Sequence, residues 1–125
     1  MKLIKIAAGD VSMLAELNDC PTSQKILDEL PIEGTADTWG DEVYFKIPVL
    51  ADQELEARAE VDVGELGYWP VGQAFCIFFG PTPLSTDKRP RAASPVNILG
   101  QLQGDATEFR TVRGGMRVLI TRAID

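Results

Sequence analysis

The chain contains no histidine among its 125 residues. Imidazole is the most frequent general base at neutral pH and a common ligand of zinc and iron. Its absence excludes Ser-His-Asp and Cys-His catalysis and the usual histidine-based metal sites. The remaining proton-transfer groups show no catalytic spacing. We therefore predict no catalytic residue, no metal site and no cofactor, and the question of enzyme activity stays open, leaning towards no.

Cysteines and long apolar runs are also scarce. The chain has two cysteines, Cys20 and Cys76, and we expect both to be reduced because no export signal accompanies them. The longest apolar run, residues 74–79, is far shorter than the ~20 residues that cross a bilayer. The first residues lack the basic and apolar regions of a signal peptide. These features predict a cytoplasmic protein that does not enter the membrane.

Basic side chains are in the minority, with 12 Lys and Arg against 19 Asp and Glu and a net charge of −7. A negative chain repels phosphate groups, which argues against nucleic acid and anionic membrane as partners. Acidic residues gather in residues 1–66 and basic ones in residues 67–125, a pattern that indicates a dipolar surface. Homo-oligomer formation stays open.

Alternation of apolar and polar residues predicts eight short strands in a single domain that spans residues 1–125. Gly9-Asp10 and Gly40-Asp41 are typical of two-residue hairpin turns, in which glycine supplies a positive φ. Helical periodicity predicts short helices at residues 21–30 and 105–112. We expect a turn at residues 64–72 and a proline-rich loop at residues 81–95. The expected strands are residues 3–8, 11–17, 35–39, 42–49, 54–63, 73–79, 96–102 and 116–124.

These elements predict a mainly β fold, a closed eight-stranded barrel with two short capping helices. Closure removes the sheet edges that otherwise invite aggregation. A two-sheet sandwich is the alternative architecture. It explains less well why both helices are short and apolar on one face.

Four segments with aromatic, glycine and proline residues follow one another along the chain: residues 38–45 (TWGDEVYF), 67–72 (GYWPVG), 76–83 (CIFFGPTP) and 93–97 (ASPVN). Together they resemble the small prokaryotic cyclophilin-like family, single-domain proteins of unsettled function that share the cyclophilin barrel. The resemblance implies an eight-stranded barrel with two capping helices, in agreement with the strand count.

The resemblance makes peptidyl-prolyl cis-trans isomerase activity of an atypical type one alternative function. Catalytic cyclophilins carry a Phe-His-Arg type motif, which has no counterpart in this chain. Lowering the amide rotation barrier of ~18–20 kcal/mol requires a donor aimed at the amide. Arg91, in the expected loop, is the candidate donor. A role as accessory subunit of an amide-hydrolysing complex is a further alternative, by fold analogy alone.

Aromatic residues near the expected strand ends predict an apolar cleft that binds a small molecule or a peptide. Core packing is the competing interpretation of the same rings. Glu42 is the carboxylate expected to face the cleft, as a hydrogen-bond acceptor or a base tuned by burial, and an exposed strand glutamate is the competing interpretation. The candidate ligand-binding residues are Trp39, Glu42, Tyr44, Tyr68, Trp69, Phe79, Thr82 and Ser94.

Overall fold

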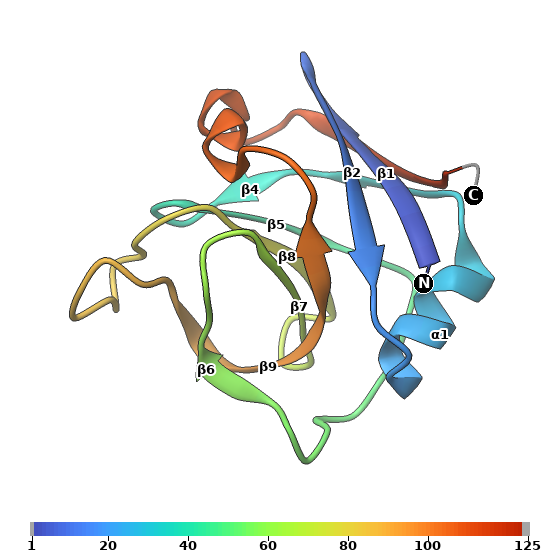
Figure 1. The fold of residues 1–125 in the computed structure, drawn as a ribbon, viewed down its shortest axis with the longest axis horizontal. Helices are drawn as coiled ribbons and strands as arrows, with labels where there is room; N and C mark the ends of the chain where they lie inside the picture. Colours follow the sequence, from blue (N-terminus) through green and yellow to red (C-terminus); the bar gives the residue numbers. More distant parts are fainter. Residues whose placement is uncertain (1, 124–125) are drawn as a thin grey trace.

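The computed structural model describes residues 2–123, which form ten β-strands, one α-helix and one 3-10 helix (Figure 1). Figure 1 shows the two helices at different ends of the β structure. The elements are β1 (Lys2–Ala8), β2 (Val11–Leu17), α1 (Pro21–Glu29), β3 (Ile32–Thr35), β4 (Asp37–Thr38), β5 (Glu42–Lys46), β6 (Arg58–Glu60), β7 (Glu65–Trp69), β8 (Ala74–Phe78), β9 (Arg91–Leu102), η1 (Ala106–Thr111) and β10 (Arg117–Arg122).

Hydrogen bonds join the described strands in the order β3-β10-β1-β2-β9-β7-β8-β5-β4, and β6 pairs separately with β9. This path is not closed by hydrogen bonds, so the predicted closed eight-stranded barrel is wrong in both closure and strand number. The two ends of the path, β3 and β4, follow each other in the chain and are joined through Ala36. Between β3 and β5, the Phe45 ring lies over Gly34, where an added Cβ would be 2.8 Å from the ring. Side-chain packing, not a ladder of hydrogen bonds, therefore joins β3 to β5.

Two strands that the sequence pattern did not predict, β3 and β7, account for the ten observed strands instead of eight. Each contains a glycine that lies under a neighbouring side chain. Gly34 lies under Phe45, and an added Cβ at Gly67 would be 2.9 Å from the Val96 side chain. Glycine weakens the local strand signal while it permits this close approach. The predicted turn at residues 64–72 therefore contains β7, and the chain reverses at residues 70–73, where the Gln73 amide donates to the Pro70 carbonyl.

The predicted hairpins and the α-helix are confirmed. Gly9 and Gly40 have φ values of 58° and 60° in their two-residue turns. α1 begins at Pro21 after an N-cap at Cys20, and it ends one residue before the predicted boundary. Both cysteines are free thiols, as expected. Neither described helix has the length and hydropathy that a bilayer-spanning segment requires.

Four predicted elements from residue 54 onward differ in the structure. The strand expected at residues 54–63 is reduced to β6, because the rest of that segment makes no ladder. β9 begins at Arg91, inside the segment expected to be a loop. The helix expected at residues 105–112 is the 3-10 helix η1, capped by the Asp105 side chain, which accepts from the Thr107 amide. β10 ends at Arg122, and Ile124, the predicted end of the last strand, lies outside the described residues.

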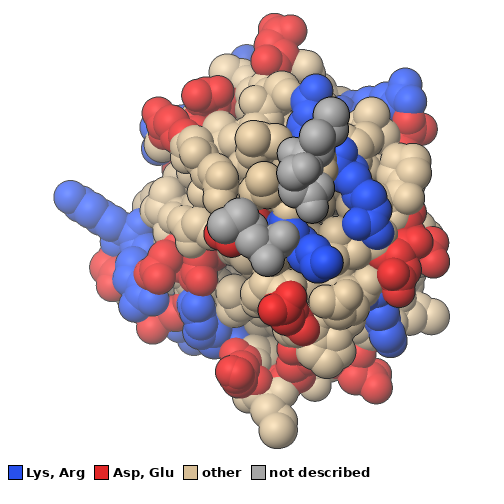
Figure 2. Space-filling view, turned by 45° about the vertical axis from the view of Figure 1, so that its right-hand side comes forward, with Lys and Arg blue, Asp and Glu red and all other residues tan. Residues whose placement is uncertain are grey.

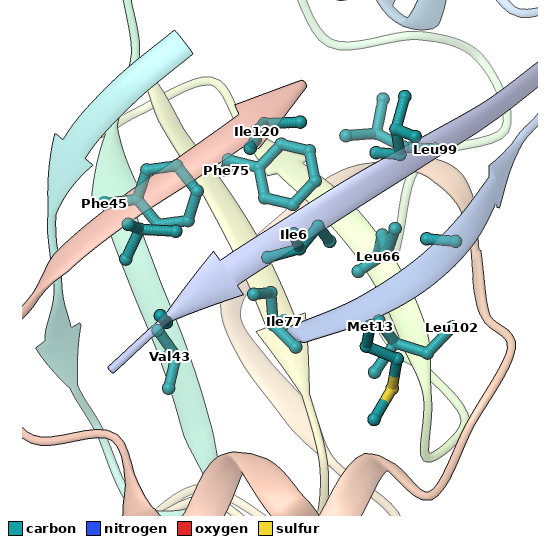
Figure 3. Packing of buried hydrophobic residues seen from close by; sticks show 14 of the residues in the cluster. Ile6, Met13, Val43, Phe45, Leu66, Phe75, Ile77, Leu99, Leu102 and Ile120 are labelled. Carbon is teal, nitrogen blue, oxygen red and sulfur yellow. The ribbon is translucent and has the colours of Figure 1, made fainter. Parts of the chain in front are cut away.

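The strands enclose the main core with their inner faces, where side chains such as Ile6, Ile77 and Leu66 point toward one another (Figure 3). Successive side chains on a strand point to opposite faces. The outer faces of β7 and β8 are also covered, by β6 and the first half of β9. A second buried cluster lies between them, made of Val61, Cys76, Phe78, Ala92 and Val96.

Acidic and basic side chains are interspersed on the face shown in Figure 2. The separation of charge along the sequence therefore produces no single-sign surface on this face. Strand pairing gives the reason, because β10 lies between β1 and β3 and brings late residues beside early ones. Glu33 of β3 and Arg117 of β10, for example, form an ion pair.

The close approach of the paired strands β9 and β2 at Gly100 generates a stability prediction. A Cβ added at Gly100 would overlap the carbonyl oxygen of Glu16 on β2. We expect Gly100→Ala to lower the free energy of unfolding by roughly 3 kcal/mol, since backbone must move to admit it. Urea denaturation measures this change. Gly114→Ala is the matched control, because nothing lies within 4 Å of its added Cβ. Equal losses of stability in the two variants would contradict this close approach of β9 to β2.

Candidate functional site

A cavity of about 190 Å³ lies between the outer face of β5 and the first half of β9. Its walls are aromatic and aliphatic, and they include one carboxylate. The three aromatic side chains of the lining are half-buried and Ala93 is exposed, so the cavity reaches the surface. The lining residues are Trp39, Glu42, Tyr44, Trp69, Ala92, Ala93 and Val96.

The turn between β4 and β5 sets Trp39 beside Glu42. The Trp39 amide donates to the Glu42 carbonyl at 2.9 Å and closes the two-residue turn, in which Gly40 has a positive φ. The Asp41 amide donates to the Pro81 carbonyl at 2.9 Å. Backbone hydrogen bonds therefore hold this corner of the cavity against the proline-rich loop.

Tyr44 and Trp69 form two walls that stand at right angles. Their ring centroids are 6.5 Å apart and their planes make an angle of 82°. The indole nitrogen of Trp69 donates to the Ser94 hydroxyl at 2.6 Å. The indole also lies directly against Gly72, where it leaves no room for a Cβ. These contacts from β9 and from the turn after β7 fix the orientation of Trp69.

Glu42 is a buried carboxylate, with 5% of its surface exposed. Its Oε1 has no hydrogen-bond partner among the described residues. Burial raises the pKa of Glu42 to about 7, and a hydrogen bond with the Cys76 thiol opposes part of that rise. An acid with a perturbed pKa that lines a cavity is typical of functional sites.

Two neighbouring groups, the Cys76 thiol and the Tyr44 hydroxyl, stay protonated at neutral pH. Burial raises the pKa of the Cys76 thiol well above its ordinary value, and the negative charge of Glu42 adds to the rise. Burial also raises the pKa of Tyr44, with smaller contributions from Asp37 and Glu42. Glu42 is therefore the group in the cavity whose charge changes near neutral pH.

The structure brings four of the eight predicted site residues together in the cavity, namely Trp39, Glu42, Tyr44 and Trp69. Two others support the cavity from outside its lining. Ser94 accepts the hydrogen bond from Trp69. Thr82 is buried and donates its hydroxyl to the Arg91 carbonyl, which holds the start of β9.

Tyr68 and Phe79 lie in the main core and do not line the cavity. On β7, Tyr68 and Trp69 are consecutive, so the pleat sends them to opposite faces and only one faces the cavity. The Tyr68 hydroxyl donates to the Val49 carbonyl at 2.7 Å. Phe79 has the inward parity of Ile77 and is 4% exposed. For these two rings the core-packing interpretation is the one that matches their positions.

Three lining residues were not predicted from the sequence, namely Ala92, Ala93 and Val96 of β9, which form one wall. Pro90 precedes this segment and Pro95 lies within it, a composition that predicted a loop. Proline is tolerated because residues 91–96 pair on one side only, with β6, as in an edge strand. In the structure Ala92 is buried while Arg91 and Ala93 are exposed, an alternation that two neighbouring alanines do not reveal in the sequence.

The buried carboxylate generates a prediction on pH and stability. In the unfolded chain Glu42 ionises near 4.5, whereas in the folded protein its pKa is about 7. The folded state keeps a proton that the unfolded state loses between these values, so the stability contributed by this site falls as pH rises through the window. We expect Glu42→Gln to raise the free energy of unfolding by roughly 2–3 kcal/mol at about pH 8, and by little below about pH 4.

Urea denaturation of wild type and variant across this pH range measures the effect. Glu56→Gln is the control, because residue 56 is exposed and lies away from the cavity lining. Parallel stability profiles for Glu42→Gln and wild type would contradict a raised pKa at Glu42.

Comparison with known proteins extends over nearly the whole chain. A family model described as cyclophilin-like matches residues 2–121. The chain is also similar to a hypothetical protein from Archaeoglobus fulgidus with a solution structure, at 36% sequence identity and a TM-score of 0.83. That alignment covers 98% of this chain and 95% of the archaeal one. No curated protein matches the chain. The similarity includes every strand that lines the cavity, and it names no activity.

Proposed function

This chain belongs to the cyclophilin-like family, and within that fold we propose that it is a binding protein whose cavity holds a small molecule or one side chain of a peptide. The observation that carries the proposal is the cavity between β5 and β9, which three aromatic rings and a buried carboxylate line together. Ligand sites are typically apolar with a few convergent polar groups, and this lining has that composition.

The positions of the rings support binding over simple packing. Trp39, Tyr44 and Trp69 are half-buried, whereas rings that only fill a core, such as Phe75, are fully buried. A ligand in the cavity would cover the apolar faces that are now exposed, which is favourable at about 25 cal/mol per Å². Buried apolar area and the acceptor at Glu42 together give affinity and orientation.

Prolyl isomerase activity is the less favoured alternative. It requires a donor beside the amide of the bound peptide. Arg91, the candidate donor, is exposed on β9 in register with Glu60 of β6, outside the cavity lining. The accessory-subunit alternative rests on fold analogy, a weaker basis than a formed cavity.

A thermal-shift screen of fragment-sized neutral and charged compounds tests the binding proposal, with tryptophan fluorescence as a direct readout because both tryptophans line the cavity. At tenfold excess over Kd, a ligand stabilises the folded state by about 1.4 kcal/mol, a shift of about 5 °C in Tm. We expect the shift to be lost in Trp69→Ala and in Trp39→Ala.

Val71→Ala is the matched control, because Val71 is exposed on the turn next to Trp69 and does not line the cavity. It should respond to each ligand as wild type does. Ligands whose shifts persist unchanged in both tryptophan variants bind elsewhere, and such a result for all ligands would overturn the proposal.

A further inference from the structure

The cavity combines a buried carboxylate, one oxygen of which has no hydrogen-bond partner among the described residues, with three aromatic rings that line the same space. We propose that it binds the alkylated ammonium group of an organic cation, with Glu42 as the counter-ion and the three aromatic rings as walls. This inference rests on the binding function proposed above and names the ligand class. The source of the group is a free small cation or a methylated lysine side chain of a peptide, which share this chemistry.

The arrangement of the rings supplies the first argument. A cation is attracted to the face of an aromatic ring within ≈ 6 Å of its centroid, and tryptophan is the strongest partner. Tyr44 and Trp69, at 82° to each other, form a corner, and Trp39 lines the same cavity from the β4–β5 turn. Several rings around one small space are typical of sites for quaternary ammonium groups.

The unpartnered oxygen of Glu42 supplies the second argument. Its Oε1 is buried without a hydrogen-bond partner, so an incoming cation would compensate a charge that the described residues leave unpaired. A primary ammonium has three N–H donors that all need acceptors. The other lining residues of β9, Ala92, Ala93 and Val96, present aliphatic side chains, which suit methyl groups better than N–H donors.

The size of the cavity and the charge of the chain agree with this ligand class. At about 190 Å³ the cavity is smaller than the ≈ 300–1,000 Å³ of drug-sized ligand pockets, so it fits one head group. The net charge of −7 attracts cations over a distance and repels anions.

Paired ligands test the proposal. Choline and 3,3-dimethylbutan-1-ol have nearly the same shape. In the alcohol a neutral tert-butyl group replaces the trimethylammonium group of choline. We expect wild type to bind choline about tenfold more tightly than the alcohol, by tryptophan fluorescence titration and calorimetry. Glu42→Gln, a variant of the same shape, should lose that preference and still bind the alcohol. Trp69→Ala should weaken both ligands.

The pH dependence provides a second readout. Choline affinity should rise from about pH 6 to about pH 8 as Glu42 ionises, while the affinity of the alcohol stays constant. The titratable groups beside Glu42 are Tyr44 on the same strand and Cys76 on β8, and Asp37 on β4 lies opposite Tyr44. Glu42→Gln separates its titration from theirs, because the rise should vanish in that variant.

The outcomes separate this inference from the binding function. If the alcohol binds as tightly as choline and Trp69→Ala weakens it, the cation proposal is overturned and the binding function stands. Failure of choline to bind, or choline binding that both Glu42→Gln and Trp69→Ala leave unchanged, also overturns it. A trimethyllysine peptide that binds more tightly than choline, while the unmodified lysine peptide does not, supports the proposal with a peptide as the source.

Discussion

Burial of both faces of β7 and β8 is the constraint on which the rest of the structure depends. Their inner faces complete the main core, and their outer faces need a second cover, which β6 and the first half of β9 supply. Arg58 and Glu65 hold this cover through two hydrogen bonds of 3.0 and 2.8 Å. Ala92 and Ala93 are too small to fill the space against β5, so the cover leaves a cavity there.

The same cover determines the electrostatics of the cavity. It removes water from Glu42, and a carboxylate without a compensating cation then favours its protonated form. Exclusion of water also strengthens any attraction between this carboxylate, the ring faces and a bound charge. A buried carboxylate that lowers stability and leaves one oxygen without a hydrogen-bond partner among the described residues is the kind of exception that functional sites contain.

Strand period predicted the elements in which each residue has a clear inside and outside, such as β2, where Val11 to Leu17 alternate between buried and more exposed positions. Strand period did not predict the strands in which a contact with a distant part of the chain determines which residue is tolerated. Gly34 and Gly67 are required by the side chains that lie over them, and locally they look like turn residues. Pro90 and Pro95 likewise favoured a loop in the sequence, where the structure has the first half of β9. Half of the candidate site residues line the cavity. The aromatic, turn-rich segments predicted which parts of the chain form the site, but not which face of each strand its side chains occupy.

By itself the sequence determined the absence of imidazole chemistry, the two-residue hairpins at Gly9 and Gly40, the helix at Pro21 and the resemblance to a family. Only the tertiary structure decided that Trp69 faces the cavity while Tyr68 enters the core, and that Glu42 is buried. The physical reason is that local period sets which residues share a face of a strand. Which face is covered, and how completely, depends on a segment that returns from a distant part of the chain.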